Sequence, residues 1–126
     1  MAGVGQVGPG MLFGRPELAE FFPPHAAITE VILRIVPRSE QRAALYAFLS
    51  THVGQALVRS TAFGTSIPGI RQDLLLDLPI PSVSKRDTAA IETSLALATS
   101  ARVSASAAEA EAIRIIEDEV LPAWLA

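Results

Sequence analysis

Residues 85–120 contain neither proline nor glycine, and alanine is their most frequent residue. Because alanine has the highest helix propensity and nothing in the run interrupts a helix, this pattern predicts one continuous helix of roughly 50 Å. Steps of three and four residues define a stripe along it that is apolar at both ends and small or polar in the middle. This stripe, named the helix seam here, consists of Ile91, Leu95, Ala98, Arg102, Ala105, Glu109, Ala112 and Ile116.

A helix of this length cannot cover its seam on so small a body, so we expect it to pack against another helix, as in a coiled coil. The alternative is a terminal helix that folds across its own domain. The expected pairing interface is the set of uncharged seam residues: Ile91, Leu95, Ala98, Ala105, Ala112 and Ile116.

The sequence of the first 84 residues predicts short helices and short strands. Residues 28–36 (ITEVILRIV) are rich in β-branched side chains, lie between prolines and predict the best strand of the chain. A helix is expected after Ser39, which stands at an N-cap position, followed by a helical stretch over residues 53–62, with Gly54 marking a kink. Shorter elements are expected in this order: a strand and turn over 1–10, a helical turn over 15–22, a turn over 63–66, extended chain over 67–70, a helical turn over 73–77 and an edge strand over 78–81.

These elements together predict an α+β fold. A small mixed β-sheet with packed helices is expected in residues 1–84, and the long helix occupies residues 85–126. Half of the 126 residues are apolar, which suffices for a modest hydrophobic core. The side chains expected in that core are Tyr46, Phe48, Leu49, Leu57, Leu78 and Ile80.

Composition excludes several classes of protein. No apolar run reaches about 18 residues, and no basic segment followed by an apolar stretch opens the chain, so we expect a soluble, cytoplasmic protein with no membrane partner. The chain has no cysteine and two histidines, His25 and His52. It therefore has no thiolate ligand and little for any other metal site, and we expect neither a metal nor a cofactor.

The net charge of −3 is unevenly distributed along the chain. Residues 1–72 carry six arginines against four acids, and the remainder carries four basic residues against nine acids. A nucleic-acid contact would therefore come from the first segment, where arginine can bind phosphate or guanine through two parallel hydrogen bonds. A coding bias toward arginine would give the same excess without any such role.

Two patterns could indicate catalysis or cofactor binding, but neither has the surrounding residues that its chemistry needs. Residues 3–8 (GVGQVG) match a dinucleotide-binding fingerprint, but only two residues precede them and Pro9 follows, so neither the strand nor the helix that the motif needs is present. Ser50, Thr51 and His52 are consecutive, whereas a catalytic triad is assembled from separate segments with an orienting acid. We therefore expect a protein that is not an enzyme.

One ordered series of segments is specific enough to indicate a protein family. It runs through residues 3–8 (GVGQVG), 31–37 (VILRIVP), 45–50 (LYAFLS), 54–55 (GQ), 62–65 (AFGT), 78–81 (LPIP) and the long alanine-rich helix. In order and spacing this series resembles the C-terminal part of a target recognition domain, with its spacer helix, from the DNA specificity subunit of Type I restriction-modification enzymes. The resemblance covers nearly the whole chain.

The resemblance implies a noncatalytic module that reads half of a bipartite site in double-stranded DNA. It also implies that the spacer helix pairs with a second specificity half or a second copy of the chain, and that methyltransferase subunits dock on this helix. The DNA contacts it implies are the turn after residue 62 and the arginines that flank it: Arg59, Phe63, Gly64, Thr65, Ser66 and Arg71. The family has a further segment before the glycine-containing strand, so we expect a truncated or split subunit.

Two other interpretations remain open. A close relative of the first interpretation is the C-terminal recognition domain of a fused restriction-methylation enzyme. It could also be a helical interaction module that dimerises through its long helix and never contacts DNA, in which case the turn and its arginines have no ligand.

Overall fold

The computed structural model describes residues 13–21, 32–64 and 68–126. Of these residues, 69% are helical, and the one sheet among them consists of two antiparallel strands. The expected combination of helices with a small sheet is therefore confirmed, but the sheet is antiparallel rather than mixed. The chain divides into two units, Met1–Ile91 and Glu92–Ala126. The start of the long helix belongs to the first unit, and the expected division into domains at residue 84 stays a prediction.

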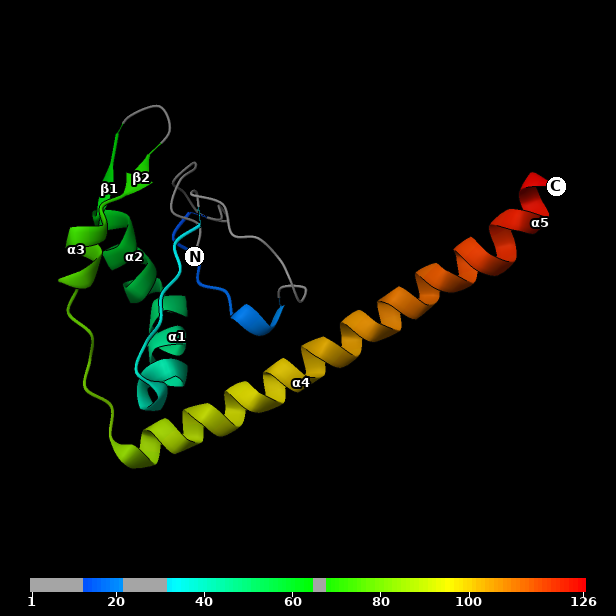
Figure 1. The fold of residues 1–126 in the computed structure, drawn as a ribbon. Helices are drawn as coiled ribbons and strands as arrows, with labels where there is room; N and C mark the ends of the chain where they lie inside the picture. Colours follow the sequence, from blue (N-terminus) through cyan, green and yellow to red (C-terminus); the bar gives the residue numbers. More distant parts are fainter. Residues whose placement is uncertain (1–12, 22–31, 65–67) are drawn as a thin grey trace. The chain divides into compact units, whose positions relative to one another are not determined.

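Two short helices form the centre of the first unit (Figure 1). A 3-10 turn, Ser39–Gln41, leads into α1, Arg42–Ser50, and α2, His52–Ser60, follows after the single residue Thr51. The backbone of Thr51 is extended, with ψ of 160°. Its hydroxyl accepts a hydrogen bond from the Gly54 N–H at 3.0 Å and donates one to the Phe48 carbonyl at 2.7 Å. The break between the helices is therefore at Thr51, and the kink predicted at Gly54 is not found there.

Gly54 has a different role, because α2 approaches the end of α1 very closely at this point. A Cβ atom at position 54 would lie 2.2 Å from the Phe48 carbonyl oxygen and 2.8 Å from the Leu49 Cα. Both atoms are backbone and cannot move aside. Glycine is needed here for space rather than for an unusual backbone conformation.

The hydrophobic core of the first unit forms around α1 and α2. Phe13, Leu49, Val58 and Ile70 are its buried members, and Val58 is fully inaccessible. Leu49, Phe48 and Leu78 were expected in the core, and they belong to it. Tyr46 and Leu57 are only half-buried, and Ile80 is 49% exposed. The partly buried side chains that pack against the core are Leu33, Leu45, Phe48, Ala62, Leu75 and Leu78.

A small hairpin follows α2. Strand β1, Ala62–Phe63, pairs antiparallel with β2, Gly69–Ile70, so that Ala62 lies opposite Ile70 and Phe63 opposite Gly69. The Arg71 N–H donates to the Thr61 carbonyl at 3.0 Å and extends the ladder by one bond. Helix α3, Gln72–Leu76, comes next. The predicted extended chain before α3 and the short helix are confirmed in the described residues. Of the turn predicted over residues 63–66, Phe63 belongs to β1, Gly64 forms no regular structure, and residues 65 and 66 lie outside the described part of the chain.

Two predicted strands are not found. Of residues 28–36, those up to 31 lie outside the described part of the chain, Ile32 forms a single bridge, and residues 33–36 form no strand. Arg34, Ile35 and Val36 are exposed, and no described strand lies beside them to complete a ladder. Residues 78–81 are also irregular, since the prolines at 79 and 81 donate no backbone hydrogen bond. Residues 1–10 lie outside the described residues, and the helical turn expected over 15–22 is the 3-10 turn Ala19–Phe21.

The long C-terminal helix is confirmed, and it has 41 residues. Helix α4, Lys85–Ile115, continues through a π-helical turn, Ile116–Val120, into α5, Leu121–Leu125. At its start the Ser84 hydroxyl accepts a hydrogen bond from the Asp87 N–H at 3.1 Å and donates to the Asp87 carboxylate at 2.7 Å. Near its end, Pro122 lacks the N–H that an α-helix needs and would clash with the carbonyl four residues before it. The π turn precedes this proline, and the helix continues beyond the uninterrupted run of residues 85–120 to Leu125.

Candidate nucleic-acid interface and pairing helix

The hairpin presents an aromatic side chain to solvent. Phe63 in β1 is 56% exposed. Gly64 follows with φ of +89°, a left-handed conformation that disfavours side chains with a Cβ, and so the chain can turn directly after the aromatic residue. Thr65 and Ser66, which were also expected to contact DNA, lie outside the described residues. Phe63 and Gly64 are therefore the described part of the expected DNA-contacting turn.

The two flanking arginines lie at the base of this hairpin, one on each side. Arg59 is in the last turn of α2, where it is half-buried and its Nε donates to the Gln55 carbonyl at 3.2 Å. Arg71 directly follows β2, and its backbone N–H bonds to Thr61, two residues after Arg59. The two arginines therefore flank the hairpin along the chain, and the Arg71 side chain bonds Asp73 while that of Arg59 bonds Gln55.

Arg71 is not free to bind a ligand without an exchange of partners. Its Nε donates to Asp73 Oδ1 at 3.1 Å, and a second guanidinium nitrogen bonds the other carboxylate oxygen. The hydrogen bonds from Arg71 hold the pKa of the Asp73 carboxyl below its ordinary value, and the same bonds raise the pKa of Arg71. Both side chains are more than half exposed, so the pair contributes little stability and can open at small cost.

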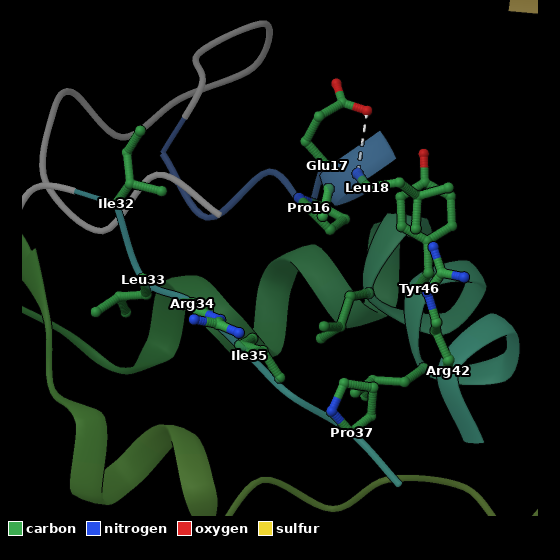
Figure 2. A pocket seen from close by; sticks show the side chains of 13 residues that line it. Pro16, Glu17, Leu18, Ile32, Leu33, Arg34, Ile35, Pro37, Arg42 and Tyr46 are labelled. Atoms are coloured by element: carbon green, nitrogen blue, oxygen red, sulfur yellow. Dashed lines mark hydrogen bonds between the residues drawn. The ribbon is translucent and has the colours of Figure 1, made fainter. Parts of the chain in front are cut away.

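A pocket of about 170 Å³, not predicted from the sequence, opens beside α1 (Figure 2). Its wall is mostly apolar and comes from residues 16–19, residues 32–37 and α1, with Glu17, Arg34 and Arg42 as the charged members. Arg42 pairs with Glu20. The pKa of the Glu20 carboxyl is lowered first by a backbone hydrogen bond and then by Arg42. The pocket joins segments that are distant in sequence, which is why no local pattern indicated it.

Most of the helix seam on the long helix is exposed to solvent. Ile91 and Leu95 are half-buried, whereas Ala98, Ala105, Ala112 and Ile116 are exposed. A solvated face lies about half a turn away from the end of the seam. There Arg114 donates two hydrogen bonds of 2.8 Å to Glu111 and one of 3.3 Å to Asp118. These bonds lower the pKa of Glu111 and raise that of Arg114.

Residues that might carry catalysis have other roles where they are described. The Ser50 hydroxyl donates to the Tyr46 carbonyl at 2.8 Å, Thr51 caps α2, and His52 is exposed. His25 lies outside the described part of the chain. Within the described residues, no group of three histidines, cysteines or acids could hold a metal ion.

The same residues contain no helix that combines the length and the apolar character needed to cross a membrane. Comparison of the chain with known protein families, curated proteins and solved structures finds no match.

Proposed function

We propose that this chain is a noncatalytic DNA-recognition module of the kind found in Type I specificity subunits. In this proposal the β1–β2 hairpin contacts double-stranded DNA, and the long helix pairs with another helix and carries the docking site for methyltransferase subunits. The observation that carries the proposal is the position of Arg59 and Arg71 on either side of the exposed Phe63 hairpin.

The chemistry of the hairpin suits a nucleic acid. Two guanidinium groups at its base can bind phosphate oxygens, and the exposed ring of Phe63 can contact a base edge or a sugar. Arg71 would exchange Asp73 for a phosphate, which replaces one exposed ionic partner with another. The acidic balance of the chain predicts that binding is weak and strongly dependent on salt.

The long helix supports the second part of the proposal. Its uncovered seam has the spacing that packs two helices side by side, and its small central residues allow their backbones to approach closely. A spacer helix of this kind would set the distance between two DNA-reading units. Cytoplasmic location follows from this role and is part of the proposal.

A second candidate is a helical pairing module that does not bind DNA. It is favoured by one specific observation, namely that Arg59 and Arg71 both already have hydrogen-bond partners within the chain. Under this hypothesis the two arginines stabilise α2 and the start of α3, and the seam alone carries the function.

Fluorescence anisotropy with a labelled DNA duplex of mixed sequence, measured at low and at physiological salt, distinguishes the two. We expect the chain to bind at low salt, and the double substitution Arg59→Ala/Arg71→Ala to raise Kd by about tenfold or more. The matched control is Lys85→Ala/Arg86→Ala, which removes the same charge from the first turn of α4 and should change Kd less than about threefold.

Equal losses in the two double variants would mean that only total charge matters, which contradicts recognition by the hairpin. Absence of binding at low salt by a folded chain would support the helical pairing module instead. Circular dichroism of each variant shows whether the helices are retained.

A further inference from the structure

The pocket beside α1 is lined on its inner side by buried apolar residues. Leu18 and Leu49 are 6% and 5% exposed, and both belong to its wall. The partly buried Leu45 lines the pocket as well and packs against the core. A ligand that enters the pocket would therefore meet apolar atoms, as ligands do in most small-molecule sites.

The volume of the pocket sets the size of such a ligand. It is about 170 Å³. An apolar cavity of about 150 Å³ holds one benzene molecule. The pocket therefore accommodates an apolar body of about one ring that carries a small polar group. Such a body would also cover Ile35, a lining residue that is 40% exposed without it.

Three charged side chains line the pocket, and two of them already have partners. Arg42 pairs with Glu20. One carboxylate oxygen of Glu17 accepts a hydrogen bond from the Leu18 N–H at 3.4 Å, which Figure 2 shows as a dashed line. The third charged side chain is that of Arg34, and within the described residues it has neither a hydrogen bond nor an ion pair. The available charge at the pocket is therefore positive.

The apolar wall decides among the anions that an arginine can bind. Inorganic phosphate and sulfate have no apolar atoms and would leave this wall exposed to water. A carboxylate on an apolar body covers the wall and can also accept two parallel hydrogen bonds from a guanidinium group. No residue of the β1–β2 hairpin lines the pocket, so the pocket is separate from the proposed DNA contact.

We propose that the pocket beside α1 binds a small monocarboxylate with an apolar body of about one ring. Its carboxylate pairs with Arg34, and its apolar body packs against Leu18 and Leu45. This inference depends neither on DNA binding nor on pairing of the long helix, because every residue that it uses lies in the first unit, outside the hairpin. Failure of either proposed role would leave it standing.

Titration of the isotope-labelled full chain with benzoate, followed by the backbone amide shifts in NMR spectra, tests the proposal. We expect saturable shifts at Leu45 and Tyr46 and a Kd of about 1 mM or lower. Two further probes separate the parts of the ligand. Benzamide keeps the ring without the charge, acetate keeps the charge without the ring, and each should bind at least about fivefold more weakly than benzoate.

The role of Arg34 is tested by its removal. Arg34→Ala should raise the Kd of benzoate by about fivefold or more, and it should change the Kd of benzamide much less, because benzamide has no charge to lose. Arg38→Ala is the matched control. Arg38 is also exposed and carries the same charge, but it does not line the pocket, so its loss should change the Kd of benzoate less than about twofold.

The role of the pocket itself is tested by filling it. Ile35→Trp adds a large side chain to the wall at a partly exposed position and should abolish binding of both benzoate and benzamide. Val36→Trp is the control, because Val36 is 74% exposed and does not line the pocket. Circular dichroism of each variant shows whether the helices are retained.

Three results would overturn the proposal. The first is a folded chain that shows no saturable shift at a benzoate concentration far above the expected Kd. The second is an equal Kd for benzoate in the folded variants Arg34→Ala and Arg38→Ala. The third is a set of benzoate shifts that is confined to other parts of the chain and persists in Ile35→Trp.

Discussion

The side-chain amide of Gln55 donates a hydrogen bond to the Gly14 carbonyl, 3.3 Å away and 41 residues earlier in the chain. The same nitrogen donates to the Leu49 carbonyl at 2.9 Å. Gln55 thereby links α2 to the end of α1 and to the segment that contributes Phe13 to the core.

Replacement of Gln55 by methionine should destabilise the first unit by about 1 kcal/mol, because two partly buried carbonyls lose their donor while the length of the side chain is kept. Urea denaturation followed by circular dichroism measures this change in the free energy of unfolding. Gln72→Met is the matched control at an exposed position of α3 and should have almost no effect. Equal effects at both positions would show that the amide links nothing.

Thr51→Ala should destabilise α2 by about 1 kcal/mol, since the hydroxyl that accepts the Gly54 N–H is lost. Thr51→Ser keeps this hydroxyl and should retain most of the stability. The thermal midpoint of unfolding, measured by calorimetry, ranks the two variants. A serine variant as unstable as the alanine variant would contradict the capping role.

The substitution of valine by alanine at two positions of α2 should have very different effects. Val58 is fully buried in the core, so Val58→Ala should cost about 2 kcal/mol through lost burial and a residual cavity. Val53 is 48% exposed, and Val53→Ala should cost less than about 0.5 kcal/mol. Urea denaturation of both variants checks the difference, and similar losses would contradict the packing of α2.

Asp73→Asn should strengthen DNA binding, because it releases Arg71 and removes one negative charge beside the hairpin. We expect Kd to fall by about threefold at low salt. Asp77→Asn removes the same charge just after α3 and serves as the control, with a smaller effect expected. Fluorescence anisotropy measures both. If Asp73→Asn leaves Kd unchanged, Arg71 does not contact DNA.

The pKa of Glu111 should rise toward the ordinary range of glutamate when Arg114 is replaced by alanine, because hydrogen bonds from Arg114 lower it in the unchanged chain. Since the folded pKa is lowered, the pair stabilises the helix above the ordinary pKa of glutamate, and this contribution is lost as pH falls through the folded pKa. Carboxyl-carbon NMR titration measures the shift. Arg86→Ala, at the other end of α4, should leave the Glu111 titration unchanged.

Helices could be predicted well from this sequence because their signals are local. The alanine-rich run gave the long helix, and apolar spacing gave α1 and α2. The strand expected at residues 28–36 fails in its described part, because β-branched residues form a strand only where another strand lies beside them. The break at Thr51 was also missed, since its cap and the close approach at Gly54 depend on how α2 packs against α1.

The candidate site was only partly predictable for the same reason. Arg59 and Arg71 were recognised as flanking a turn, but the pairing of Arg71 with Asp73 depends on side-chain directions after β2. The pocket beside α1 depends on three segments that meet only in the folded unit. The π turn precedes Pro122, a residue that local reasoning takes as the end of a helix.

The chain has one tryptophan and one tyrosine, and they belong to different units. Trp124 is exposed in α5, and Tyr46 is half-buried in α1. Excitation beyond the tyrosine absorption band therefore reports on the C-terminal unit alone, whereas excitation within that band adds the tyrosine emission of the first unit. The molecule carries a separate optical signal for each of its units, and the melting of one can be followed against the other in a single unlabelled sample.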